Sequence, residues 1–384
     1  MPFDLEFQRK RAIIIVYAGE QMILRKIHLK DYRNYSKESF SFDRQLQIIL
    51  GDNAQGKTNL LEAVYLACMG RSFRSARLRE TFGDFKNPFE LEYLFEEEGR
   101  ERHLILTAGE KGGMSMVLNH LKLERRSDLF GLFPMVLFSP DHLRTFTQGP
   151  SLRRAFLDRE ISLVSRAYFH QLVRYNKTLL SRNALLKSDV VDIRQLEVYE
   201  EALSVYGVDL TRRRAAFLEE LAVHAGNMHQ GLTSGSETLT MNYLGCDAQD
   251  SEEYLERLRE SRDRDRRVGF TGYGPHADDL RIGLNGRDLR KYGSQGQVRL
   301  GALSVYFSLV PFIEEQLGMK PILLLDDVFS ELDRQRRNQL LEIFIGHQKI
   351  ITATDLDGLD SSLSERAATI WIADGKAVGG KIDK

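Results

Sequence analysis

The sequence predicts an α/β fold in which two distant chain segments build one domain and a mainly helical lobe is inserted between them. A continuous apolar run at residues 46–50, typical of a strand buried in a parallel sheet, leads into a glycine-containing loop and a helical run. A second such run, residues 322–325, ends in two carboxylates. Between these strands, apolar residues recur at the three- and four-residue spacing of amphipathic helices.

The chain divides into four expected parts. Residues 1–21 are expected to precede the fold, which Met22 opens. Residues 22–138 form the first part of the domain, residues 139–264 the helical lobe, and residues 265–384 the second part of the domain. Short alternating segments between Gly and Asn turns predict strands in the first part, at residues 27–29, 40–42, 91–95, 103–107 and 114–118.

Composition excludes several classes of protein. The 54 Lys and Arg against 55 Asp and Glu give a net charge of −1 over 384 residues, which excludes a protein held to nucleic acid by bulk charge but not a local basic face. Cys68 and Cys246 are too few for a disulfide scaffold or a zinc knuckle and indicate a reducing cytosol. No apolar run approaches the ~18 residues of a membrane helix; the closest candidate, Ala12–Ala18, is also short for a signal peptide. We therefore expect a cytoplasmic protein with no membrane partner.

The lobe is expected to be a short helical hairpin or a small bundle, because a long coiled coil would need more unbroken heptads. Residues 238–244 alternate as a strand does. Six arginines alternate with acidic residues over residues 256–267, which predicts a solvated helical face or a linker.

The loop after the first buried strand matches the P-loop pattern, with the sequence Gly51-Asp52-Asn53-Ala54-Gln55-Gly56-Lys57-Thr58. Its glycines let consecutive backbone N–H groups face a polyphosphate, and the following helix adds its positive end. We expect Lys57 to reach the β- and γ-phosphates and Thr58 to ligate Mg²⁺. ATP and Mg²⁺ are the expected cofactors.

Two carboxylates follow the second buried strand. Asp326 is expected to hold Mg²⁺ opposite Thr58, and Asp327 to orient or deprotonate an attacking water. The separation of 269 residues between Lys57 and Asp326 means that the intervening chain returns to its starting sheet. The chain lacks the Asn-Lys-x-Asp motif of guanine-nucleotide-binding proteins.

The third motif is a glycine-containing turn, residues 292–297, which precedes another helical run. A helix N-terminus with small residues is an anion site. Since the P-loop and Asp326 already serve the phosphates of their own subunit, the expected ligand is the nucleotide of a partner subunit, contacted by Ser294, Gly296 and Gln297. The alternative is a plain helix cap by Ser294.

These residues resemble the ATP-binding-cassette head shared by transporters and SMC proteins. Residues 294–297 are similar to its signature motif, and Ser330-Glu331-Leu332-Asp333 to its D-loop. Thr354-Asp355 stands where the family has a switch histidine, which this chain lacks. Asp327 replaces the usual Glu, and its shorter side chain implies slow turnover.

Within that superfamily the chain resembles the RecF family of bacterial recombination mediators from Met22 to about Gly379. The matching segments are Asp31-Tyr32-Arg33-Asn34-Tyr35, read as a polar loop, the P-loop extended by Asn59, and residues 70–74, 153–158, 175–177 and 274–276. Ala277 departs from the family, which often carries Arg there.

Four arginines lie close together after the P-loop helix, at Arg71, Arg74, Arg77 and Arg79. They form a candidate DNA phosphate contact, with an exposed face balanced by Glu80 as the alternative. Arg153-Arg154 and residues 212–214 are weaker candidates. The chain has no helix-turn-helix or zinc finger, so DNA binding is expected to follow backbone and shape rather than base sequence.

The resemblance implies an ATP-dependent homodimer and weak ATPase. It would bind gapped or single-strand/double-strand junction DNA and promote RecA loading with RecO and RecR. One alternative is the motor subunit of a membrane transporter, which the large helical insert and the absent switch histidine disfavour. Another is a DNA scaffold with a vestigial ATP site, which the intact Lys57, Thr58, Asp326 and Asp327 disfavour.

Overall fold

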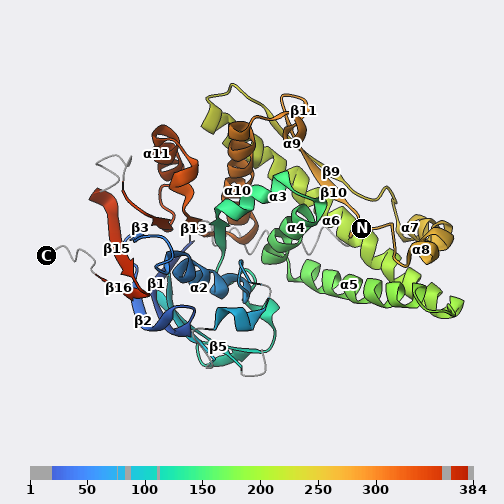
Figure 1. Ribbon diagram of the computed structural model, residues 1–384, viewed down its shortest axis with the longest axis horizontal. Helices are drawn as coiled ribbons and strands as arrows, with labels where there is room; N and C mark the ends of the chain where they lie inside the picture. The colour runs from blue at the N-terminus through green and yellow to red at the C-terminus, as the bar shows by residue number, and fades with distance from the viewer. Residues whose placement is uncertain (1–19, 76, 83–87, 110–112, 357–364, 379–384) are drawn as a thin grey trace. The chain divides into compact units, whose positions relative to one another are not determined.

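The computed structural model describes residues 20–75, 77–82, 88–109, 113–356 and 365–378. Two compact units share the chain (Figure 1). The first unit comprises Met1–His142 with Tyr306–Lys384, and the second unit comprises Leu143–Val305. The second unit therefore continues beyond the expected end of the lobe at residue 264, and the 292–297 turn belongs to it. The reason is strand pairing, since β9 (Leu239–Leu244) pairs antiparallel with β10 (Asp279–Leu284).

The six-stranded sheet of the first unit carries the P-loop strand at its centre. The strand order is β16 (Lys376–Ala377), β15 (Ala367–Ala373), β3 (Leu46–Leu50), β14 (Lys349–Ala353), β13 (Ile322–Asp326) and β8 (Met135–Phe138). All pairs are parallel except β15–β16. Every residue of β3 and β13 is buried, so the two strands expected from continuous apolar runs are confirmed. Their carboxyl ends meet at one edge of the sheet, where Asp326 lies opposite Thr352.

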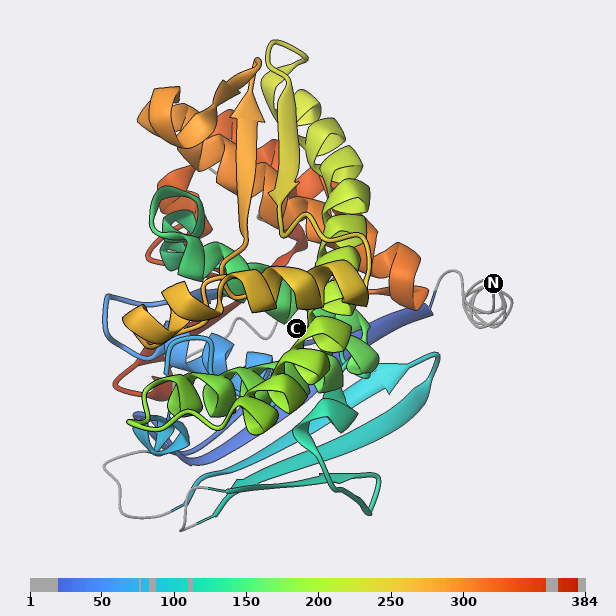
Figure 2. The ribbon, with the colours of Figure 1, turned by 90° about the vertical axis from the view of Figure 1, so that its right-hand side faces the viewer.

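The other sheet of the first unit is mostly antiparallel (Figure 2). Its strands are β12 (Met319–Lys320), β1 (Glu20–Tyr32), β4 (Glu90–Glu97), β5 (Arg100–Ala108), β6 (Met114–Leu118) and β7 (Leu121–Leu123), with β2 (Tyr35–Ser41) on β1. The expected strands of residues 22–138 are present. The expected loop at residues 31–35 is wrong: Tyr32 and Tyr35 are paired, fully buried strand residues, and only Arg33-Asn34 turn. Strand β1 begins before Met22, and residues 1–19 of the expected extension lie outside the described residues.

Helix α2 (Lys57–Met69) lies against both sheets of the first unit and is buried on nearly all sides. Tyr93 of β4 donates a hydrogen bond to the Ala63 carbonyl oxygen (2.6 Å). Helix α11 (Arg334–Ile343) follows β13, and short 3-10 turns complete the unit, at Leu78–Thr81, Arg126–Leu129, Pro140–His142 and Val328–Glu331.

Helix α10 (Gln295–Leu317) crosses the boundary between the two units. It is the one helix of the described residues that is long and apolar enough to span a membrane by length and composition. We expected no such segment, because polar residues interrupt every apolar run. Its most apolar stretch is 72% buried, as in a helix that crosses the core of a soluble protein, so the helix is weak evidence for a membrane span.

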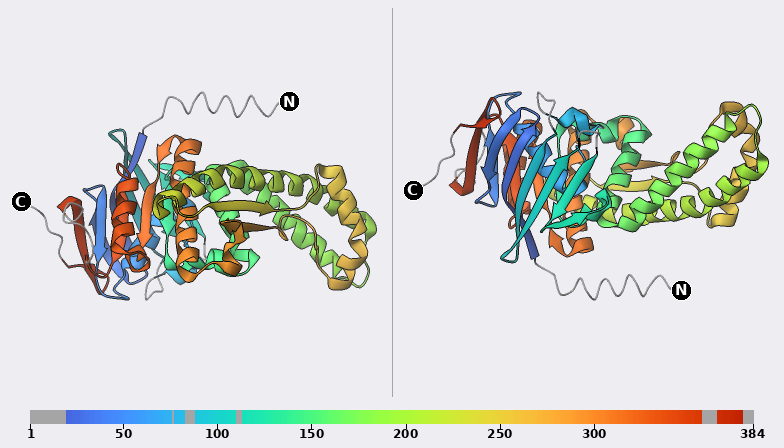
Figure 3. Two further views of the ribbon diagram at one scale, coloured as in Figure 1. Left: turned by 90° about the horizontal axis from the view of Figure 1, so that it is seen from above. Right: turned by 90° about the horizontal axis from the view of Figure 1, so that it is seen from below.

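The second unit contains one helix much longer than expected (Figure 3). Helix α6 (Ile193–Thr233) runs 41 residues, about 60 Å at 1.5 Å per residue, and packs along α5 (Arg166–Leu186). The expected short hairpin is therefore wrong for α6, although α5 and α6 do pair. The other elements of this unit are α3 (Leu143–Thr147), α4 (Pro150–Val164), α7 (Ser251–Glu260), α8 (Arg262–Val268), α9 (Leu289–Tyr292) and β11 (Arg287–Asp288).

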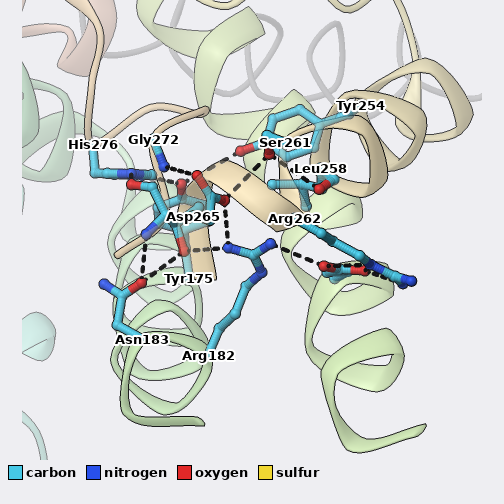
Figure 4. Close-up of polar contacts among 12 residues, drawn as sticks. Tyr175, Arg182, Asn183, Tyr254, Leu258, Ser261, Arg262, Asp265, Gly272 and His276 are labelled. Carbon is cyan, nitrogen blue, oxygen red and sulfur yellow. Dashed lines mark hydrogen bonds and ion pairs between the residues drawn. The ribbon is translucent and has the colours of Figure 1, made fainter. Parts of the chain in front are cut away.

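A buried charge cluster joins three helices of the second unit, α5, α6 and α8 (Figure 4). Arg182 of α5 is fully buried and bonds Glu200 of α6 (2.9 Å) and Asp265 of α8 (2.8 Å), which are buried as well. Arg262 forms a second, partly exposed pair with Glu200. The 256–267 segment is therefore only partly the solvated face that its charge pattern predicts, because Arg262 and Asp265 anchor it to the core.

We expect Arg182→Met to destabilise the protein by about 3–5 kcal/mol, since it leaves Asp265 buried without its cation. Denaturant-induced unfolding followed by circular dichroism measures this. The matched control is Arg257→Met, which removes only exposed ion pairs and should leave the unfolding free energy nearly unchanged. Equal effects of the two substitutions would contradict this account.

Candidate functional site

The P-loop connects β3 to α2 at the carboxyl edge of the parallel sheet. Two of its positions require glycine: Gly51 (φ 151°) and Gly56 (φ 120°). A Cβ on Gly51 would stand 2.3 Å from the Ile372 carbonyl oxygen, and one on Gly56 would stand 2.7 Å from Nδ2 of Asn34. No side chain caps the first turn of α2, whereas Asp192 caps α6. The uncapped N–H groups and the helix dipole make this terminus an anion site.

Lys57 folds back over the loop. Its ammonium is largely buried and donates to the carbonyl oxygens of Gly51 (2.5 Å) and Asp52 (2.9 Å). Burial lowers the pKa of Lys57, and the nearby carboxylates of Asp327 and Asp326 act against that shift. Phosphate oxygens are stronger acceptors for a charged amine than neutral carbonyl oxygens, so a bound phosphate can replace these two hydrogen bonds of Lys57.

Asp326 is the central acid of the site. Its Oδ1 accepts hydrogen bonds from the hydroxyls of Thr58 (2.9 Å) and Thr352 (2.7 Å). Burial raises the pKa of Asp326, and these two hydrogen bonds lower it. The Asp327 N–H donates to Oγ1 of Thr352 (2.9 Å), and Asp327 itself has left-handed backbone (φ 48°). The structure thus brings together the Thr58–Asp326 pair that we expected from the sequence.

The site fits a magnesium–nucleotide complex. Within the described part of the chain, no Lys or Arg forms an ion pair with Asp326 or Asp327, and no cluster of three or more His, Cys, Asp or Glu could hold a metal by itself. Mg²⁺ is commonly held by one or two protein oxygens together with substrate phosphates. Thr58 and Asp326 supply two such oxygens beside an uncapped helix terminus.

Two hairpins support the loop from outside. Asn34 donates to the Gln55 carbonyl oxygen (3.0 Å), and Tyr35 donates to that of Gly56 (2.9 Å). From the β15–β16 turn, the Asp374 N–H donates to Oε1 of Gln55 (2.6 Å). The loop conformation is therefore held by backbone-directed hydrogen bonds before any nucleotide binds.

The signature-like turn lies in the second unit at the start of α10. Ser294 and Gln297 form a reciprocal capping box: Gln297 N–H donates to Ser294 Oγ (3.2 Å), and Ser294 N–H donates to Gln297 Oε1 (2.9 Å). The plain cap that we weighed is thus present. Ser294, Gln295 and Gly296 are also exposed, and a Cβ on Gly296 would meet almost open space. The N–H groups of Gln295 and Gly296 remain at the first turn as donors for an external anion.

The remaining motif residues lie after β13 and β14. Ser330 donates to the Asp327 carbonyl oxygen (2.8 Å), and Asp333 caps α11 through the Arg336 N–H (2.9 Å). At the switch position, the Thr354 hydroxyl donates to Asp355 (3.1 Å), and both residues are exposed.

The arginine stretch is anchored to the P-loop helix. Glu62 of α2 is fully buried and accepts two hydrogen bonds from the Arg33 guanidinium (2.8 and 2.7 Å), with a third from Ser72. Arg33 also donates to Ser75 (2.7 Å), and Phe73 packs edge-on against Tyr65 of α2. The segment that carries the arginines is thus fixed to α2.

The four arginines differ in what they face. Arg74 donates to Oδ1 of Asn59 (2.8 Å), and its charge helps to lower the pKa of Asp326, so it faces the P-loop. Arg71, Arg77 and Arg79 are exposed, as Arg74 is. All four side chains can therefore be reached by an external polyanion.

The weaker arginine candidates have structural partners. Arg153 is buried and forms a two-pronged pair with Asp279 (2.6 and 2.9 Å), and Arg154 donates to the Asp278 carbonyl oxygen. Arg214 is buried against Asp158 (2.6 Å). Arg213 pairs with Asp209, and Arg212 donates to the Gln249 carbonyl oxygen. These pairings do not support the hypothesis that Arg153, Arg154 and residues 212–214 contact DNA.

Sequence reasoning missed Thr352, Arg33 and Glu62. Thr352 is a polar residue near the carboxyl end of the buried strand β14. Its position could have indicated a site residue if the pairing of β14 with β13 had been known. A buried Glu in the P-loop helix carries no such local signal.

Known proteins with a similar sequence or fold belong to the class that the P-loop and its sheet indicate. Residues 23–357 match the family described as RecF/RecN/SMC N terminal domain. The Smc head domain of Pyrococcus furiosus shares the fold, with a TM-score of 0.52 and 16% identity over 93% of this chain and 95% of that one. The fold and the site define a P-loop ATPase head of the ABC/SMC class.

Closer relatives narrow the assignment. RecF of Agathobacter rectalis, a DNA replication and repair protein, is 37% identical, with 88% of this chain and 93% of the relative covered. RecF of Exiguobacterium sp. is 38% identical, with 92% and 98% covered. A solved recombination mediator protein, RecF-ATP in the RecFOR pathway, is 34% identical with a TM-score of 0.87, covering 94% of this chain and 98% of that chain. The chain belongs to the RecF family of DNA replication and repair proteins, so the transporter alternative is not supported.

We expect Thr352→Val to raise the Mg²⁺ concentration for half-maximal ATP hydrolysis about tenfold, because outer-shell partners orient the ligands of a metal. Steady-state ATPase assays over a Mg²⁺ series measure this. Thr354→Val is the control, since its hydroxyl bonds only the exposed Asp355. An unchanged Mg²⁺ dependence of Thr352→Val would refute the supporting role of Thr352.

Proposed function

We propose that this chain is an ATP-dependent DNA-binding recombination and repair mediator. It dimerises on ATP, binds gapped or single-strand/double-strand junction DNA, and promotes RecA loading with RecO and RecR. One observation supports this proposal: the two elements that a nucleotide site shared between two copies would need lie in separate units. The P-loop with Asp326 is one element, and the exposed turn at Ser294 is the other.

In the proposed reaction, Lys57 and the first turn of α2 bind the β- and γ-phosphates, with the P-loop residues Gly51–Thr58 and Asn59 lining them. Thr58 and Asp326 hold Mg²⁺. Asp327 orients the attacking water. Its carboxylate is one methylene shorter than that of Glu, which supports slow hydrolysis suited to a switch.

The partner subunit would complete the site through Ser294, Gly296 and Gln297. Ser294 and the free N–H groups of the α10 first turn form an exposed anion site. A second copy of the chain brings this turn to the γ-phosphate and adds attraction that exists only with ATP bound. Dimerisation would then depend on nucleotide.

DNA contact is proposed for the segment that follows α2. Arg71, Arg77 and Arg79 are exposed there, and Arg74 links the segment to Asn59, next to Thr58. Because the same helix carries the nucleotide ligands and the anchor Glu62, phosphate binding and DNA binding share one rigid element. This supports DNA-stimulated hydrolysis.

The RecA-loading role with RecO and RecR rests on family membership and on the solved relatives, which are recombination mediator proteins of the RecFOR pathway. The alternative of a scaffold with a vestigial ATP site predicts no turnover with or without DNA. The intact Thr58–Asp326 pair favours an active site.

We expect Ser294→Arg to abolish the ATP-dependent dimer, since a bulky cation would occupy the phosphate position at the turn. Sedimentation velocity with and without ATP measures the dimer fraction. The control is Ser188→Arg in the exposed α5–α6 connection, which should dimerise normally. If Ser294→Arg still dimerises with ATP, the shared nucleotide site is wrong.

We expect Arg77→Ala to lower the slope of log Kd against log salt for duplex DNA by about 0.9, the value of one phosphate contact. Fluorescence anisotropy over a salt series with ATP measures this, on gapped, duplex and single-stranded DNA. Arg100→Ala, which changes an exposed arginine at the start of β5, should keep the full slope. Equal slopes for all three proteins would exclude Arg77 from the contact.

A further inference from the structure

A chain of hydrogen bonds leads from the signature-like turn to buried residues of the same unit, the second. The Oε1 atom of Gln297 accepts the Ser294 N–H, and its Nε2 atom donates to Oε1 of Glu237 (2.7 Å). Only one orientation of the Gln297 amide satisfies both bonds, because the oxygen only accepts and the nitrogen only donates. The side chain that caps the turn is therefore itself held by Glu237.

Glu237 is held in turn by a buried histidine. It lies between α6 and β9, and its Oε2 atom is 3.1 Å from Nε2 of His229. His229 is fully buried near the end of α6, and its Nδ1 atom lies 2.9 Å from the hydroxyl of Ser304 on α10. An ionised carboxylate only accepts, so Gln297 and His229 both donate to Glu237. Two elements thus fix the carboxylate in one place.

The turn itself has little packing to define its shape. Ser294, Gln295 and Gly296 are exposed, and Gln297 is the half-buried member of the four. A glycine-containing turn loses much conformational freedom when it binds a ligand, unless it is ordered beforehand. The inward hydrogen bond of Gln297 to Glu237 provides that ordering.

We propose that Glu237 is a positioning residue of the signature site: through Gln297 it holds the Ser294 turn in the form that receives the partner's nucleotide. This inference rests on the proposed function, in which Ser294 contacts ATP across the dimer. The same chain of hydrogen bonds ties the turn to the end of α6.

The test uses the full chain with a slowly hydrolysed ATP analogue. For Glu237→Ala we expect the ATP-dependent dimer to dissociate on the order of tenfold more readily over a protein dilution series, as for other residues that orient a binding group. Binding of the analogue to the monomer should stay unchanged, and the thermal unfolding midpoint measures the separate cost of leaving buried His229 without its acceptor. Glu237→Gln should restore the dimer, since its amide oxygen still accepts from Gln297 and its nitrogen can donate to His229. Glu219→Ala, an exposed glutamate on α6, is the matched control and should behave as the unmodified protein.

The outcomes separate this inference from the proposed function. If Ser294→Arg abolishes the dimer and Glu237→Ala leaves it unchanged, the positioning role is wrong and the shared site stands. If Ser294→Arg still dimerises, both are wrong. If Glu237→Ala lowers the unfolding midpoint, Glu237→Asp is the deciding variant, because it keeps the charge but withdraws the carboxylate from Gln297. A weaker dimer with normal binding of the analogue to the monomer would support the positioning role. A normal dimer would overturn it.

Discussion

The structure of the first unit depends on one buried carboxylate. Asp326 stands at the end of the buried strand β13, where burial raises its pKa and opposes its ionised form. Hydroxyls from two other elements donate to it and favour the ionised form, Thr58 from α2 and Thr352 from β14. Both hydrogen bonds depend on the register of β14 against β13 and on the position at which α2 begins. The P-loop is the chain that joins β3 to that helix, so its place also depends on where α2 begins.

Helix α2 connects the phosphate-binding edge to the rest of the first unit. Thr58 faces Asp326, Asn59 faces Arg74, and one turn further Glu62 holds Arg33 in a buried pair. A buried carboxylate whose cation is removed is costly, so the Arg33–Glu62 pair holds the hairpin of β1 and β2 rigidly against α2. The same hairpin supports the P-loop through Asn34 and Tyr35. The expected nucleotide ligands, the residues that support the loop and the arginine segment are therefore all attached to α2 and the β1–β2 hairpin.

Arginine has two separate uses in this protein. In the second unit, Arg153, Arg182 and Arg214 are buried against acids and serve as internal cross-links between distant segments. In the first unit, Arg71, Arg77 and Arg79 remain exposed. A net charge of −1 sums both uses, and so it carries little information about whether a local surface can bind DNA.

The sequence by itself determined the elements whose signal is local. The P-loop pattern, the buried strands at 46–50 and 322–325 and the pair of acids that follows are contiguous patterns, and the structure has each strand where the apolar run predicts it. Only the tertiary structure decided which polar residues support them. Thr352, the Arg33–Glu62 pair and the Arg182–Asp265 pair join residues 26 to 83 positions apart, and each depends on strand register or helix packing. Charge pattern alone assigned Asp265 to a solvated face, because a sequence shows which charges are neighbours along the chain and not which ones folding removes from water.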